Sequence, residues 1–219
     1  MKPELRKMLI NHLSRQTRVS DANPVATSIL ETVAAAIVEA GKETERQLNN
    51  MDDELIEMGY DAVLTEEYRA LSEELLGSAF VVLQRILNTA AQSAVKCSQL
   101  AADQTSSTQR VGHKGDAYGH GTKLVGTRTP AQLVNAVANY YKHKDEMGPW
   151  SGLSGQSLRT INAVKTLGMV ENRSDNLSAA TSALGATESD LLPLLVGIAT
   201  WSKELEDQLR ADANLPKVP

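Results

Sequence analysis

The segment LLGSAFVVLQRIL, residues 75–87, is apolar on nearly every side of a helix and therefore decides the fold. It lies inside residues 65–101, where apolar side chains recur at the three- and four-residue intervals of an α-helix. The recurring positions are Tyr68, Leu71, Leu75, Ala79, Val82, Ile86 and Ala90. Because a helix that is apolar all round is typical of a buried position, we predict a central helix over residues 65–101. Gly77 costs such a helix about 1 kcal/mol relative to alanine, which indicates close helix packing at this point.

Three helices are predicted before this segment. Residues 3–17 form the first, because their leucine and methionine side chains fall on one helical face. The second begins at Asn23 and Pro24, a capping residue followed by a proline in the first turn. Its apolar stripe consists of Ile29, Leu30, Val33, Ile37 and Ala40. A short helix follows from Asp52 and ends near Gly59.

Two helices are predicted after residue 128. Thr129 and Pro130 start the first in the same way as Asn23 and Pro24, and it stops before Gly148. Its buried stripe consists of Leu133, Val134, Val137 and Tyr141. The second covers residues 156–167 and ends at Gly168. Its inward side chains are Leu158, Ile161 and Val164.

Two more helices complete the predicted set. Ser174 caps a short helix that ends at Gly185. The last helix runs from Thr187 or Ser189 to Arg210, with Pro193 in or near its first turn, where proline is tolerated. Its apolar positions are Leu191, Leu195, Ile198, Leu205 and Leu209.

Residues 103–128, DQTSSTQRVGHKGDAYGHGTKLVGTR, have no periodicity and are rich in Gly, Ser and Thr. A connection of this length is uncommon in a compact domain and is usually functional or mobile. We predict a long loop here, in which TKLVGT allows a small β-hairpin. Residues 212–219 are predicted to be a loose tail.

No segment shows the alternation of a β-strand, and no repeat of fixed period is present. The chain is therefore predicted to be all-α, an irregular bundle of six to eight helices with a long Gly/Ser/Thr-rich loop. Its 219 residues show no composition shift that would divide them, so we expect a single domain over residues 1–219.

The composition indicates which class of protein and which cellular compartment to expect. Hydrophobic residues make up 42% and charged residues 22%, which is ordinary for a soluble globular protein. Cys97 is the only cysteine, which excludes an internal disulfide framework and a cysteine-based zinc cluster. The N-terminus lacks the apolar stretch of a signal peptide, and no window approaches the roughly 18 consecutive apolar residues of a membrane span. We therefore expect a cytoplasmic protein without a membrane segment.

The charge distribution is uneven. The net charge of −5 argues against bulk nucleic-acid binding of the histone type. Residues 110–144, however, hold one acid, Asp116, and three of the four histidines. Their cations are Arg110, Lys114, Lys123, Arg128, Lys142 and Lys144. Such a basic island predicts an anion-binding site, and the alternative is that it pairs with the acidic helices around it.

A polar face is predicted on the helix that starts at Pro130. Asn135, Asn139 and His143 are spaced four apart and share this face, beside Lys142. A histidine there is able to act as a general acid or base near neutral pH, and a neighbouring lysine favours an anionic substrate. The alternative is structural, since cations in the last turn interact favourably with the helix dipole.

The stretch ANYYKH, residues 138–143, resembles the signature of the HEPN superfamily. These small all-α proteins include metal-independent RNases of toxin–antitoxin, CRISPR and anti-phage systems. Their signature is an Arg, often followed by Asn, His or Asp, and then a His after a short spacer. Asn139 corresponds to the polar position and His143 to the final His, whereas Ala138 stands where the family has its arginine.

The resemblance implies proton transfer by His143 on a ribose 2′-OH and a homodimer. It also implies that Lys142, Lys144 or Arg159 replaces the missing cation, although a lysine lacks the guanidinium fork. We therefore expect an RNA-directed protein, either a metal-independent endoribonuclease or an inactive RNA binder. The expected catalytic residues are His143, Asn139 and Lys142. The expected RNA contacts are Arg110, Lys114, Lys123, Arg128, Lys144 and Arg159.

The alternative function is a non-catalytic helical interaction or accessory protein of the immunity type. In that case the acidic helices over residues 42–76 would bind a partner protein. No metal or other cofactor is expected, because His113, Asp116 and His120 match no ligand spacing. The stretch GHKGDAYGHG also lacks the residue order and the preceding strand of a nucleotide-binding P-loop.

Overall fold

The computed structural model describes residues 7, 19, 23–105, 111–213 and 215. Within these residues it contains eight α-helices and no strand, which confirms the all-α bundle. The helices are α2 (Pro24–Asn49), α3 (Asp53–Glu57), α4 (Tyr60–Thr105), α5 (Lys114–Tyr118), α6 (Pro130–His143), α7 (Gly155–Val164), α8 (Asn176–Ala183) and α9 (Leu192–Asp212). The helix predicted over residues 3–17 lies outside the described residues.

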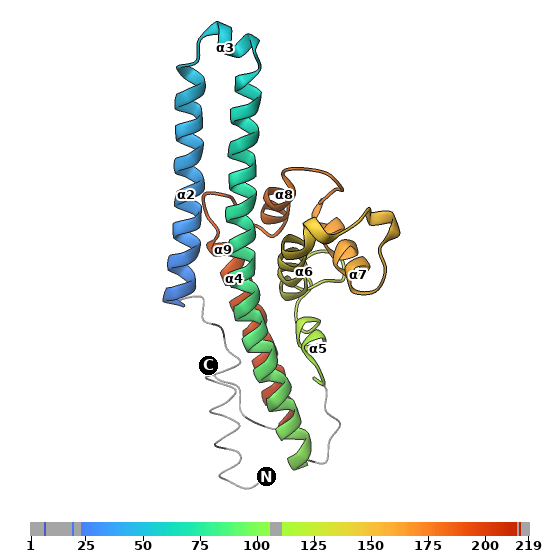
Figure 1. Ribbon diagram of the computed structural model, residues 1–219. Coiled ribbons are helices and arrows are strands. Elements are labelled where there is room, and N and C mark those ends of the chain that lie inside the picture. Colours follow the sequence, from blue (N-terminus) through green and yellow to red (C-terminus); the bar gives the residue numbers. More distant parts are fainter. Residues whose placement is uncertain (1–6, 8–18, 20–22, 106–110, 214, 216–219) are drawn as a thin grey trace.

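Helix α4 is the axis of the molecule (Figure 1). Helix α2 lies antiparallel to it and is joined to it through α3, while α9 runs along its other half and α6 to α8 lie to one side. Leu76, Phe80, Leu83 and Leu87 of α4 are fully buried, so the segment that is apolar all round does form the centre of the core. Helices α2, α3, α5, α6, α8 and α9 all contact α4 directly.

The apolar stripe predicted on α4 is displaced from the face that is buried. Ala79 and Ala90 of the predicted stripe are buried, but Leu71 is 48% exposed, and Leu75, Val82 and Ile86 are only partly buried. The most deeply buried large side chains are instead Leu76, Phe80, Leu83 and Leu87. Because α2 and α6 flank α4 on either side, the intervening face of α4 stays open along its length.

Gly77 is the point where α6 crosses α4. A Cβ atom on Gly77 would lie 2.2 Å from ring atoms of Tyr141. The ring is held from its other end, because the Tyr141 hydroxyl donates a 2.6 Å hydrogen bond to Glu74 and the Lys144 ammonium lies 5.1 Å from the ring centroid. The close packing predicted from the glycine is therefore present.

Replacing Gly77 with Ala is expected to lower the free energy of unfolding by about 1–3 kcal/mol, since the new methyl group meets a ring that cannot move away. Urea denaturation followed by circular dichroism measures this change. In a Tyr141→Ala background the same substitution should instead stabilise the protein by up to about 1 kcal/mol, because alanine is the better helix former. A loss of equal size in both backgrounds would contradict the packing explanation.

Several helix ends follow the predicted local rules. The Asn23 side chain accepts a hydrogen bond from the backbone N–H of Ala26, and Thr129 forms a capping box with Gln132. Pro193 lies in the first turn of α9, and Gly168 adopts a left-handed φ of 81°. Three predictions were wrong. Helix α8 begins at Asn176 rather than after Ser174, α9 begins at Leu192 rather than at Thr187 or Ser189, and Leu158, predicted to point inward, is 37% exposed.

The segment predicted as a long loop carries more structure than its composition indicates. Helix α4 extends to Thr105, and α5 starts at a capping box formed by His113 and Asp116. The predicted hairpin is reduced to a single antiparallel bridge between Val125 and Arg128. Contacts to α9 and α4 fix the segment, because they supply partners that its own sequence pattern does not reveal.

The predicted loose tail is also packed where the structure describes it. Helix α9 continues to Asp212, and Ala213 and Leu215 are both buried. The backbone N–H of Leu215 donates a 2.8 Å hydrogen bond to the Arg210 carbonyl. The remaining tail positions lie outside the described residues.

Within the described residues, α2 is the one helix long and apolar enough to cross a membrane by length and composition. Its only charges in the apolar half are the carboxylates Glu31 and Glu39. Core helices of soluble proteins and signal sequences have the same character, and α2 lies along α4 in the structure. This feature alone therefore does not place the chain in a membrane.

Candidate functional site

The C-terminal half of α6 carries the predicted catalytic residues. Ala138, at the position of the HEPN arginine, is fully buried in the core. Leu133, Val134 and Val137 are buried beside it, as predicted for this helix. A guanidinium has no room at position 138, so the methyl group there is part of the packing.

Asn139 is bound to α4. Its Oδ1 accepts a 2.9 Å hydrogen bond from Nε2 of Gln84, and the same amide nitrogen donates a 2.9 Å bond to Oδ1 of Asn135. Gln84 is buried, with 6% of its surface exposed. The predicted polar face therefore divides, because Asn135 and Asn139 are partly buried and hold α6 against α4, whereas His143 is exposed.

His143 lies at the exposed end of α6. Its Nδ1 is 3.1 Å from Oε2 of Glu146, and 53% of its side chain is exposed. An exposed contact of this kind contributes little to stability. His143 is thus accessible to a ligand, but Asn139 is turned away from it toward Gln84.

The two lysines that flank His143 differ. Lys144 donates a 2.8 Å hydrogen bond to Glu74 and lies over the Tyr141 ring, so it acts as a packing cation between α6 and α4. This bond and the Tyr141 hydroxyl lower the pKa of the Glu74 carboxyl. Lys142 is exposed and lines a surface groove. Only Lys142 is therefore placed to meet an external anion.

The groove lies between the start of α2, the middle of α4 and α6, and its volume is about 1340 Å³. Its walls combine apolar and polar groups. The apolar side chains include Val25, Ile29, Val81, Val82 and Ile86. The polar side chains are Asn23, Gln84, Arg85, Asn88, Thr89, Gln92, Ser93 and Lys142. Gln84, which holds Asn139, is thus also a wall residue of the groove.

Helix α5 bonds to a wall residue of this groove, although its own side chains do not line it. The Lys114 ammonium donates a 3.1 Å hydrogen bond to Oδ1 of Asn88, a groove residue, and the Tyr118 hydroxyl donates a 2.8 Å bond to the same oxygen. Arg85 was missed in the sequence because it lies outside the basic island. Arg85 lies on the face of α4 that α2 and α6 leave uncovered. The sequence alone does not show which face that is.

The other predicted RNA contacts are not gathered at the groove. Lys123 donates a hydrogen bond to the Gly119 carbonyl, and the backbone of Arg128 pairs with Val125. Arg159 donates hydrogen bonds to Gln156 on α7. None of the three lines the groove. Arg110 lies outside the described residues.

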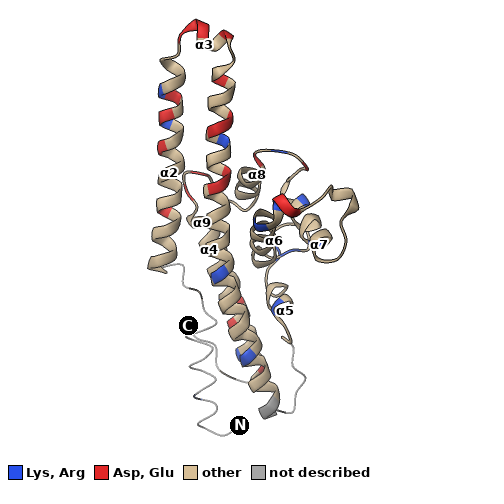
Figure 2. Cartoon of the chain, in the orientation of Figure 1, with Lys and Arg blue, Asp and Glu red and all other residues tan. Residues whose placement is uncertain are grey.

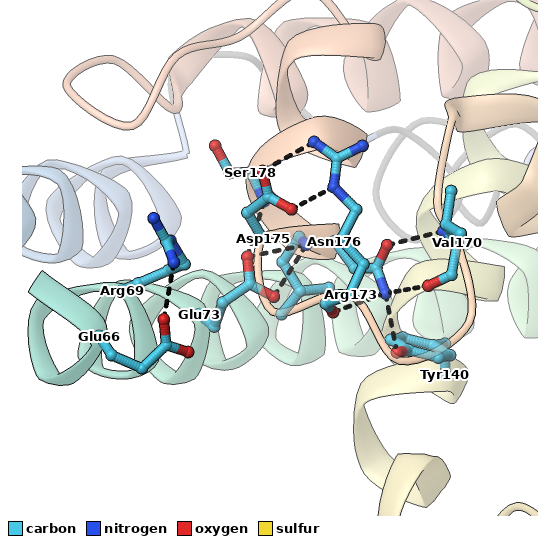
Figure 3. A network of polar contacts seen from close by, with 10 residues as sticks. Glu66, Arg69, Glu73, Tyr140, Val170, Arg173, Asp175, Asn176 and Ser178 are labelled. Atoms are coloured by element: carbon cyan, nitrogen blue, oxygen red, sulfur yellow. Dashed lines mark hydrogen bonds and ion pairs between the residues drawn. The ribbon is translucent and has the colours of Figure 1, made fainter. Parts of the chain in front are cut away.

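A polar network holds the start of α8 and the loop before it against α4 and α6 (Figure 3). Both carboxylate oxygens of Glu73, on α4, accept hydrogen bonds from the backbone at the start of α8, at 2.9 to 3.0 Å from Leu177 and Ser178. Asn176 is buried and bonds to Val170, Arg173 and the Tyr140 hydroxyl. Burial raises the pKa of Glu73, although the backbone donors oppose the shift. Sequence reasoning missed Glu73 as a cap because it lies on a distant helix.

Among the described residues, neither a metal-binding cluster nor a reactive cysteine competes with this site. No group of three or more His, Cys, Asp or Glu side chains there is arranged to hold a metal ion. His113 and Asp116 are used in the capping box of α5. Burial, with a smaller contribution from Glu206, raises the pKa of the Cys97 thiol to about 11, which removes it as a nucleophile near neutral pH.

No protein-family model matches the chain, and no curated protein and no solved structure matches it either. The resemblance to the HEPN signature therefore rests on residues 138–143 together with the all-α fold.

Proposed function

We propose that the chain is an RNA-directed helical protein that binds the phosphate backbone of RNA at the groove between α2, α4 and α6. The observation that carries the proposal is that two cations from different helices line one groove, with a third bonded to a residue of its wall. Arg85 of α4 and Lys142 of α6 line the groove, and Lys114 of α5 is bonded to its wall residue Asn88. Cations so placed neutralise phosphates and release counterions.

The remaining groove chemistry also suits a polynucleotide. Amide and hydroxyl side chains such as Gln92 and Thr89 provide donors and acceptors for ribose and base edges. The volume of about 1340 Å³ exceeds the 300–1,000 Å³ or so of a typical small-molecule pocket. The net charge of −5 does not oppose the proposal, because the acids concentrate on the α3 end of the hairpin, away from the groove (Figure 2).

The proposal is for binding without cleavage at His143. A HEPN-like reaction would need His143, a polar partner and a cation in one place. Asn139 is instead bonded to Gln84, and Ala138 is buried where the family has its arginine. We therefore assign Lys142 to phosphate binding and treat catalysis by His143 as the outcome that would change the proposal.

Binding is tested by fluorescence polarisation of a labelled single-stranded oligoribonucleotide at several salt concentrations. Arg85→Gln and Lys142→Gln should each weaken binding and reduce the slope of log K against log salt by about 0.7, the value for one phosphate contact on a single strand. The matched control is Arg159→Gln, since this exposed cation lies on α7 outside the groove. Salt-independent binding, or equal losses in all three variants, would refute the proposed site.

Cleavage is tested separately by incubating purified protein with tRNA in the presence of a chelator, beside His143→Ala. We expect intact RNA in both reactions. Cleavage by the unsubstituted protein alone would instead assign His143 to a metal-independent ribonuclease. Cleavage by both proteins would exclude His143 as the catalytic group.

A second candidate function is supported by a different part of the chain. Residues 38–71, which form the outer half of the α2–α4 hairpin, contain no buried residue. This acidic segment matches the alternative of a helical interaction protein, since an unburied helical pair is available to a partner.

A further inference from the structure

The outer half of the hairpin extends past the other helices at the α3 end (Figure 1). Isolated helices without tertiary packing are only marginally stable in water, so a helical pair with no buried residue gains little from its own contacts. It nevertheless carries large apolar side chains that are 37% to 66% exposed. They are Leu55, Ile56, Met58, Tyr60, Val63 and Leu71. This combination is typical of a surface that another protein surface covers.

The exposed apolar residues continue into the groove along one face of α4. Tyr60, Leu71 and Val82 are eleven residues apart, which is about three helical turns, so they lie in one line. Ser78 lies on the same line and is exposed, which leaves the line open between the two ends. Val82 is a groove residue. The acidic hairpin and the groove are therefore opposite ends of a single open face.

The charge changes sign along this face (Figure 2). The α3 end is acidic, with Asp52, Asp53, Glu54, Glu57, Asp61 and Glu67 exposed or partly exposed. The cations of this end, Lys42, Arg46 and Arg69, already pair with Glu39, Glu43 and Glu66 three residues away. The other half of α4 carries the exposed cations Arg85 and Lys96.

We propose that the partner of the acidic hairpin is a second copy of this chain, packed antiparallel along the open face of α4. A twofold axis midway between Leu71 and Val82 would place Leu71 of each copy opposite Val82 of the other. It would also bring Glu67 of each copy next to Arg85 of the other. A parallel arrangement would oppose acid to acid and base to base, which is unfavourable.

The antiparallel arrangement also closes. With the twofold axis midway between Leu71 and Val82, Tyr60 of one copy is level with the groove residue Ser93 of the other. Each acidic end therefore reaches the groove of the other copy at the same time, which gives an isologous dimer rather than a filament. This inference rests on the proposed function in one respect, because the hairpin occupies the groove assigned to RNA. RNA binding and dimerisation consequently exclude each other.

Sedimentation velocity of the full chain over a range of protein and salt concentrations tests self-association directly. We expect a dimer that dissociates as salt rises, since exposed charge pairs are screened. Leu71→Ser should raise the dimer dissociation constant by about tenfold or more, as for a buried interface anchor. Val196→Ser is the matched control, because Val196 is also 48% exposed but lies on α9.

A charge exchange tests the register. E67K and R85E should each lose the dimer alone, since both create two like-charge contacts across the twofold axis. An equimolar mixture of the two variants should restore a heterodimer, because each copy then meets an opposite charge. A monomer at every concentration, a dimer insensitive to Leu71→Ser, or a mixture that fails to associate would overturn the antiparallel dimer.

The RNA arm separates this inference from the proposed function. Leu71→Ser should bind the labelled oligoribonucleotide at least as tightly as the unsubstituted chain, since Leu71 lies outside the groove. If no variant binds RNA but Leu71→Ser still loses the dimer, the proposed function fails and the dimer stands. If a dimer persists on saturating RNA, the mutual exclusion is wrong.

Discussion

Replacing Trp201 with Ala is expected to lower the free energy of unfolding by about 3–5 kcal/mol, the usual cost of deleting a large buried aromatic side chain. Trp201 is 1% exposed, and its ring centroid lies 6.3 Å from that of Tyr118. Its indole N–H donates a 3.1 Å hydrogen bond to the Ala117 carbonyl. The Trp201→Ala substitution therefore leaves a cavity where α9 packs against α5 and removes contacts that hold α5 in the core.

Circular dichroism during urea denaturation measures this loss, because fluorescence would change with the removal of one of only two tryptophans. Trp201→Phe serves as the control. It keeps most of the apolar contact and removes only the indole donor, while the Ala117 carbonyl still accepts from the backbone N–H of His120, so the expected loss is about 0.5–1.5 kcal/mol. If phenylalanine were as damaging as alanine, the lost volume could not be the main cause.

Replacing Arg210 with Met is expected to lower the free energy of unfolding by a similar amount, about 3–5 kcal/mol. Arg210 and Glu206 lie one turn apart on α9, and their side chains are only 1% and 3% exposed. The Arg210 Nε donates a 2.8 Å hydrogen bond to Oε1 of Glu206, and Nη2 of the same guanidinium lies 2.8 Å from that oxygen. Removing it takes away the charge that neutralises a buried carboxylate.

The matched test replaces both partners. Arg210→Met with Glu206→Leu should recover most of the loss, because burying two apolar side chains in place of an ion pair is often neutral or stabilising. Thermal unfolding of the single and double variants at one pH provides the comparison. A double variant no more stable than Arg210→Met would show that Arg210 stabilises the fold through contacts other than its charge pair with Glu206.

The two proposals give the basic residues distinct roles that position in the sequence does not distinguish. Lys142 and Lys144 are two residues apart, yet one lines the groove and the other is bonded to Glu74. Arg85 joins Lys142 although it lies in a different helix, outside the basic island. Proximity in the fold, rather than density along the chain, therefore selects the candidate RNA contacts.

The sequence by itself determined seven of the eight helices in the part of the chain that the structure describes, all except α5, and many of their ends. Asn23 with Pro24, Thr129 with Pro130, and Gly168 act through bonds and φ angles within a few residues, so short patterns are sufficient to predict them. The apolar segment at residues 75–87 likewise predicted the central helix, because burial on all sides requires apolar residues on all sides.

Only the tertiary structure decided which faces and side chains are available. Glu73 caps α8 from more than a hundred residues away, and Gln84 draws Asn139 inward across a similar non-local contact. Leu71 belongs to an apolar stripe and is still exposed, because α2 and α6 flank that face without covering it. Helical periodicity states which side chains share a face, but the neighbours that cover the face come from distant parts of the chain.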